Sequence, residues 1–189
     1  YETEAQAGIS HFIEHLLFKG TAKRATSGDI SAAIEGVGGI LNGGTDKELT
    51  LYWCKVAQHN FALALDVLAD MLLHSRFDPT DIERERQVII EEINMTKDSP
   101  SQQVNMLIDE LLWPGHPLGR DIAGSKESMA AITRNMLLNY LQNQYLTDNT
   151  VVAIAGNISH QEAVAAVSQA LADWTIRQPH PGYLAYQEQ

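Results

Sequence analysis

The chain has 189 residues, which suits one domain of average size, or a small domain pair, with a packed core. Its 13 Lys and Arg against 24 Asp and Glu give a net charge of −11, which argues against nucleic acids and anionic membranes as partners, since both attract basic surfaces. No apolar run reaches the roughly 18 residues of a membrane-spanning helix, and the single Cys54 excludes an internal disulfide or a thiolate-caged metal.

Taken in chain order, apolar periodicity, capping residues and helix breakers predict helices over residues 8–18, 27–37, 60–74, 78–97, 103–113, 133–145 and 160–174. Apolar and β-branched patterns predict strands over residues 40–45, 49–57 and 150–155, with the first two joined as a hairpin. Strands and helices mix without strict alternation. This indicates an α+β fold, with a mostly antiparallel sheet packed against several helices.

Within the first predicted helix, His11 and His15 are four residues apart, so they lie on one face with Glu14 beside them. Two imidazoles at this spacing can bind one zinc ion while the carboxylate stays near a metal-bound water, and H-x-x-E-H is the inverzincin signature. The rest of this helix is apolar nearly all round, so a buried helix is expected. A hydrogen-bonded core cluster is the alternative, but the three residues together favour a metal.

A catalytic zinc site usually has a third protein ligand. At about 100° per residue, the isoleucines of the helix over 78–97 gather on one side, and Glu91 lies nearly opposite them, facing solvent. Glu92 and Glu85 are two turns apart on one flank of the apolar stripe. We therefore prefer Glu92 as the ligand, with Glu85 supporting the site from behind. The competing interpretation is a solvated acidic flank beside two arginines.

Residues 11–21 (HFIEHLLFKGT) resemble the metal-binding segment of the pitrilysin/insulysin peptidases. They are most similar to the processing-peptidase branch, which includes bacterial homologues of the mitochondrial processing peptidase beta subunit. The family's spacing between its second histidine and its third ligand matches the 76 residues between His15 and Glu92, and its glutamate seven positions earlier falls on Glu85. Further similar segments are residues 88–93, 116–119 and 149–157.

The resemblance implies that residues 1–178 form the first, zinc-binding domain of a two-domain clamshell, with the first strands truncated. A second homologous domain, in cis or on a partner subunit, would carry further substrate-binding side chains, and residues 179–189 would be a linker toward it. We therefore expect the isolated chain to bind one Zn²⁺ but to cleave peptides only weakly.

The glycine-rich strand before the hairpin turn resembles the family's edge strand, which pairs with the substrate backbone. The resemblance assigns substrate binding to Asn42, Gly43, Gly44 and Thr45. The family usually has Ala at the position of Gly43, and the glycine is expected to make the edge more flexible. The alternative is a plain turn into the hairpin; a phosphate-binding loop lacks the required Lys-Ser/Thr and helix.

These features together predict a zinc endopeptidase for unstructured peptides or small polypeptides. His11, His15 and Glu92 would hold the metal, Glu14 would act as general base, and Glu85 would assist. The alternatives are a non-catalytic subunit of the same family, and a hydrolase or lyase for a small molecule. The single cysteine is consistent with a cytoplasmic location and does not exclude the periplasm.

Overall fold

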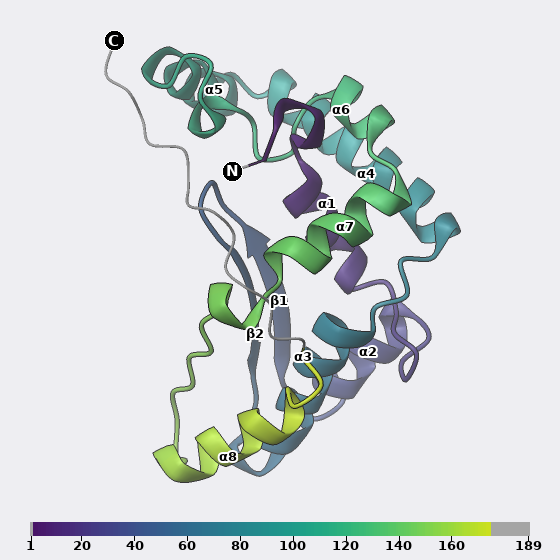
Figure 1. The fold of residues 1–189 in the computed structure, drawn as a ribbon, viewed down its shortest axis with the longest axis vertical. Coiled ribbons are helices and arrows are strands. Elements are labelled where there is room, and N and C mark those ends of the chain that lie inside the picture. Colours follow the sequence, from purple (N-terminus) through teal and green to yellow (C-terminus); the bar gives the residue numbers. More distant parts are fainter. Residues whose placement is uncertain (1, 175–189) are drawn as a thin grey trace.

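The structure, a computed structural model, describes residues 2–174, and helices form most of it (Figure 1). Among these residues, no helix combines the length and apolar content that crossing a membrane requires. The helices are α1 (Ile9–Leu17), α2 (Ser27–Glu35), α3 (Phe61–His74), α4 (Pro79–Asp98), α5 (Pro100–Leu112), α6 (Lys126–Ala131), α7 (Arg134–Gln144) and α8 (His160–Ala170). All seven predicted helices are present, whereas the short α6 was not predicted. The predicted linker over residues 179–189 lies outside the described residues.

The predicted hairpin is confirmed, and it forms the whole sheet of the described residues. Strand β1 (Ile40–Thr45) pairs antiparallel with β2 (Thr50–Lys55), in a register that sets Ile40 opposite Lys55 and Thr45 opposite Thr50. The N–H of Asp46 donates to the carbonyl of Leu49 and closes the turn. The predicted α+β fold is confirmed in part: the sheet is antiparallel and packs against helices, but in the described residues it has two strands and the helices predominate.

The predicted third strand, residues 150–155, is not a strand in the structure. In Figure 1 this segment runs as an extended connection toward α8, and it pairs with no strand of the described residues. A cavity of about 1010 Å³ lies between it, β2 and α3, and Val151 is 91% exposed. A strand needs a neighbouring strand to take its backbone hydrogen bonds, and the β-branched pattern alone does not supply one.

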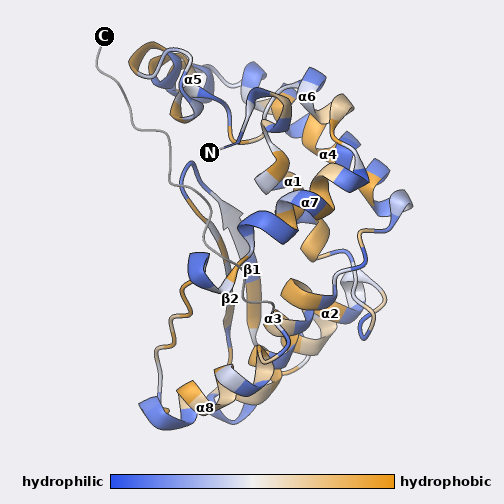
Figure 2. Ribbon diagram, viewed as in Figure 1, coloured by the Kyte–Doolittle hydropathy of each residue, from blue (hydrophilic) through white to orange (hydrophobic). Residues whose placement is uncertain are grey.

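The core consists of two apolar clusters. One joins α1, α4 and α7, with Phe12, Ile13 and Ile89 fully buried; the other packs α2 and α3 against the hairpin. Figure 2 shows orange residues on α1 and α3, whereas α4 carries both blue and orange ones. α1 is apolar on most sides, as predicted; of its few polar side chains, Ser10 contacts Tyr140 of α7 at 2.9 Å, whereas His15 faces α4 and Glu14 faces β1.

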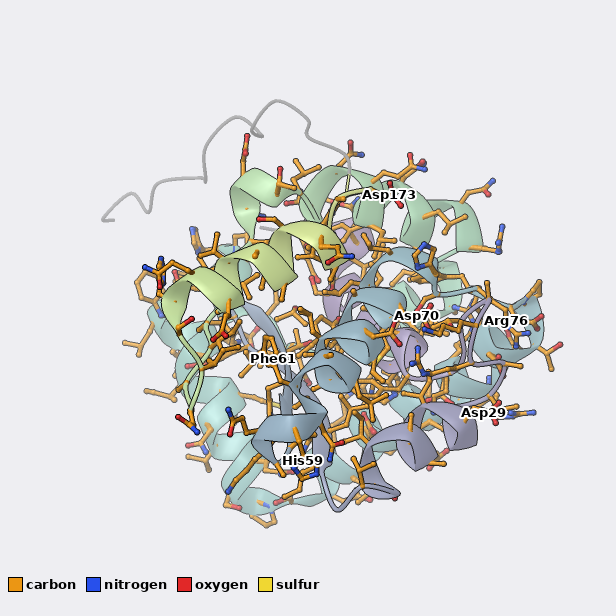
Figure 3. The ribbon with its side chains drawn as sticks, turned by 90° about the horizontal axis from the view of Figure 1, so that it is seen from below. Asp29, His59, Phe61, Asp70, Arg76 and Asp173 are labelled. Atoms are coloured by element: carbon orange, nitrogen blue, oxygen red, sulfur yellow. The ribbon has the colours of Figure 1, made fainter. Side chains whose placement is uncertain are left out.

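Contacts from outside the helix fix both ends of α1. At its start, the Glu2 carboxylate accepts hydrogen bonds from the N–H groups of Gly8 (2.7 Å) and Ser10 (2.8 Å), which helix geometry otherwise leaves unpaired. After its end, Arg24 and Thr21 both donate to the buried Asp70 of α3, at 2.6 and 2.7 Å. Figure 3 labels Asp70 on the side of the molecule where this loop packs against α3. The helix that carries the histidines is thus held at both ends.

Candidate metal centre

The three predicted metal ligands converge where α1 packs against α4. The Nε2 atoms of His11 and His15 lie 3.2 Å apart, with their rings nearly perpendicular at 82°. The Oε2 atom of Glu92, from α4, lies 3.7 Å from each of these nitrogens. Among the described residues, this is the group of histidine, cysteine and acidic side chains whose ligand atoms are close enough to share one metal ion. Glu91, its neighbour, is exposed, as the helix geometry predicted.

The donor set and its spacing fit a zinc ion. Tetrahedral coordination with bonds of about 2.0–2.1 Å places ligand atoms about 3.4 Å apart, close to the 3.2 and 3.7 Å observed here. Two imidazoles and one carboxylate are also a known catalytic zinc set. The Glu92 side chain is 42% exposed, against 18% for His11 and 16% for His15. The group therefore opens to solvent on the side of Glu92, which leaves access for water.

The two histidines differ in the surroundings of their Nδ1 atoms, which point away from the candidate metal position. Burial lowers the pKa of His11, and the nearby His15 lowers it further, outweighing the opposite effects of Glu92 and Glu14. The lowered pKa favours the neutral imidazole that metal binding requires. The Nδ1 atom of His11 is buried and has no hydrogen-bond partner in the described part of the chain. This ring is therefore oriented by packing rather than by a polar contact.

His15, in contrast, has a carboxylate behind it. Its Nδ1 atom lies 3.1 Å from Oε2 of Glu85, which is only 3% exposed. The other oxygen of Glu85, Oε1, lies 2.8 Å from Nζ of Lys19. A carboxylate on one ring nitrogen of a histidine orients the other nitrogen outward. Glu85 thus lies where the helix-face argument put it, whereas Lys19 was missed, although it follows His15 by four residues.

Glu14 points toward the hairpin rather than toward α4. Its Oε2 atom accepts a hydrogen bond of 2.7 Å from the hydroxyl of Thr45 in β1. The sequence assigned Thr45 to substrate binding and contained no signal for this contact, because 31 positions separate the two residues. The negative charge of Glu14 also acts on His11, where it partly offsets the lowering of the pKa by burial and by His15. The arrangement places a carboxylate near the three candidate ligands and fixes it from the adjacent strand.

The four residues predicted to bind substrate are divided between the faces of β1. Asn42 and Gly44 are exposed, and the side-chain oxygen of Asn42 accepts the N–H of Gly43 at 2.8 Å. Gly43 and Thr45 face α1. Gly43 packs closely, because a Cβ there would lie 2.9 Å from the Phe18 ring and 3.3 Å from Oε1 of Glu14. Among residues 2–174, the other edge of β1 has no strand beside it.

Comparisons with known proteins show which family the chain resembles. The family described as Insulinase (Peptidase family M16) matches residues 1–126, and the Peptidase M16 inactive domain matches residues 131–189. An uncharacterized zinc protease of Mycobacterium leprae is 42% identical over 171 residues, covering 90% of this chain and 38% of its own length. The mitochondrial-processing peptidase subunit beta of Dictyostelium discoideum is 35% identical over 178 residues, covering 94% of this chain and 38% of its own length.

Solved structures share the fold. The crystal structure of pitrilysin superposes with a TM-score of 0.84 at 20% identity, covering 98% of this chain and 20% of that one. A protease from Helicobacter pylori superposes with a TM-score of 0.90 at 21% identity, covering 98% of this chain and 45% of that one. This chain thus spans about two fifths of the length of the curated relatives that it matches. Because the family match covers most of the residues, the chain belongs to the insulinase family of metallopeptidases, peptidase family M16.

Proposed function

We propose that the chain carries the catalytic centre of a zinc-dependent endopeptidase. The observation that carries this proposal is the convergence of His11, His15 and Glu92, with the Glu14 carboxylate fixed beside them. A bound zinc ion would supply Lewis-acid chemistry, lowering the pKa of a water molecule and polarising a peptide carbonyl. The presence of all these groups favours a catalytic member over a non-catalytic subunit of the family.

Glu14 is proposed as the general base and acid. It is not one of the three converging ligands, so its carboxylate is available to accept the proton of the attacking water and deliver it to the leaving amine. Its hydrogen bond from Thr45 holds one oxygen and leaves the lone pairs of the other for that proton. Glu85 supports the same centre by orienting the His15 ring.

The substrate is proposed to be an unstructured peptide that pairs with β1. Strand addition uses main-chain hydrogen bonds, so it accepts many sequences but requires an extended partner. Residues 42–45 offer such an edge beside Glu14, and the Thr45 contact ties this strand to the general base. Folded proteins cannot present an extended segment without unfolding locally, which favours peptides and small polypeptides as substrates.

The complete enzyme is proposed to need a second domain, in cis or on a partner subunit. The exposed side of Glu92 leaves the centre open to water, and an open site positions a peptide poorly. The match of residues 131–189 to the Peptidase M16 inactive domain and the similarity to a mitochondrial-processing peptidase subunit support the same view. We expect the chain alone to bind zinc but to cleave peptides slowly, and to become faster when the second domain is added.

Two measurements test this proposal: zinc binding and peptide cleavage. The chain should bind one zinc ion, His15→Ala should abolish that binding, and the exposed Glu91→Ala is the matched control that should leave it unchanged. Cleavage of an unstructured fluorogenic peptide should require zinc and should be lost in His15→Ala. Stoichiometric zinc in His15→Ala, or zinc-independent cleavage, would overturn the proposed function.

A further inference from the structure

Lys19 shares the Glu85 carboxylate with a candidate metal ligand. Its Nζ atom lies 2.8 Å from Oε1 of Glu85, while Oε2 of the same carboxylate lies 3.1 Å from Nδ1 of His15. Each oxygen of this carboxylate thus has its own partner. Rotating the carboxylate to improve one contact would weaken the other, so Lys19 and His15 together determine its orientation.

Local geometry explains why Lys19 reaches this carboxylate. It follows His15 by four residues, and its own N–H still bonds to the carbonyl of Leu16 at 3.1 Å, which continues the turn after α1. Residues four apart on a helical turn lie on the same side. His15 and Lys19 therefore face the same position on α4, where Glu85 lies.

Because Glu85 is buried, its ion pair with Lys19 is needed to compensate the carboxylate charge. Glu85 is 3% exposed and lies on α4 between the buried Ile82 and Ile89. A carboxylate in such a position is costly unless charged or hydrogen-bonding groups compensate it. The ammonium of Lys19 supplies the positive charge, and its side chain stays 30% exposed, so its own desolvation is incomplete.

Resting on the proposed zinc site, we propose that Lys19 is a positioning residue for the metal. It holds the Glu85 carboxylate so that Oε2 faces His15, and the His15 ring then directs Nε2 toward His11 and Glu92. Within residues 2–174, the ion pair of the Lys19 ammonium is with Glu85, which is neither a candidate ligand nor part of the substrate strand. Its effect on zinc affinity therefore depends on Glu85. A residue that only stabilised the packing of α1 against α4 would not show this dependence.

The experiment measures zinc affinity of the full chain by competition with a chelator, and so it does not depend on peptide cleavage. Loss of a carboxylate behind a metal-bound histidine weakens binding by about 10- to 100-fold, and we expect Lys19→Met to weaken it by about tenfold. Lys19→Arg keeps the charge and should stay within about threefold of wild type. The control is Lys23→Met, which removes only an exposed ion pair with Asp66 and should change nothing.

A double-mutant comparison tests the route of the effect. If Lys19 acts through Glu85, adding Lys19→Met to Glu85→Gln should change zinc affinity by less than about twofold. Circular dichroism verifies folding, and Lys19→Gln replaces Lys19→Met if the latter does not fold. Wild-type zinc affinity in a folded Lys19→Met or Lys19→Gln variant, or an equal loss with and without Glu85, would overturn the inference. Failure of the wild-type chain to bind zinc would instead overturn the proposed function.

Discussion

Replacing Thr45 by Val removes one hydroxyl and nearly preserves the shape of the side chain. The lost contact is the 2.7 Å hydrogen bond to Oε2 of Glu14, so the substitution releases the proposed general base without touching a metal ligand. Valine also suits a strand, because β-branched side chains fit the pleated surface. The expected consequence is therefore confined to the orientation of Glu14.

The expected loss of rate follows from the charge of Glu14, which accepts the lost hydrogen bond. A hydrogen bond to a charged group contributes about 1.5–3 kcal/mol, and about 1.4 kcal/mol corresponds to tenfold in rate, so kcat should fall by about 10- to 150-fold. KM and the zinc content should stay near those of wild type, because neither binding surface is altered. Thr45→Ser keeps a hydroxyl and should recover most of the rate.

The assay is steady-state cleavage of a quenched fluorescent peptide by the zinc-loaded enzyme. Thr50→Val is the matched control, since Thr50 lies opposite Thr45 on β2 and the substitution is the same. A higher KM at unchanged kcat in Thr45→Val would refute the reasoning. That result would mean that Thr45 serves peptide pairing, as the sequence resemblance suggested, and not the orientation of Glu14.

Three further predictions concern the same centre. Glu14→Gln should keep stoichiometric zinc by metal analysis but lower kcat by at least about 10²-fold, because an amide cannot accept the proton; a rate within tenfold of wild type would place the base elsewhere. Gly43→Ala should lower the midpoint of thermal unfolding, since overpacking against Phe18 costs about 1–3 kcal/mol, and an unchanged midpoint would show that the strand shifts freely. The pKa of His11 is lowered below its ordinary value of 6.5, so the unfolded chain binds its proton more readily. In chelator, the free energy of unfolding should therefore fall as the pH drops below 6.5, and denaturant titrations should show a smaller fall for His11→Gln, whereas an identical fall would exclude His11 as its source.

The sequence alone was sufficient for every α-helix except the short α6 and for the three candidate ligands. Helical spacing is a local property, so His11 and His15 share a face whatever surrounds α1, and Glu85 and Glu92 share a flank of α4 for the same reason. The apolar residues around the histidines predicted a buried helix, which the structure confirms. Helix geometry favoured Glu92 over Glu91, with a solvated acidic flank as the alternative, and the spacing in the similar family selected Glu92 independently.

Tertiary structure decided everything that depends on contacts between distant segments. Residues 150–155 have the composition of a strand but no neighbouring strand among the described residues, and the sheet is smaller than predicted for that reason. The contacts of Thr45 with Glu14 and of Lys19 with Glu85 depend on how β1 and α4 pack against α1, which no periodicity encodes. Spacing along a helix determines which side chains lie together, but only packing determines which groups they meet.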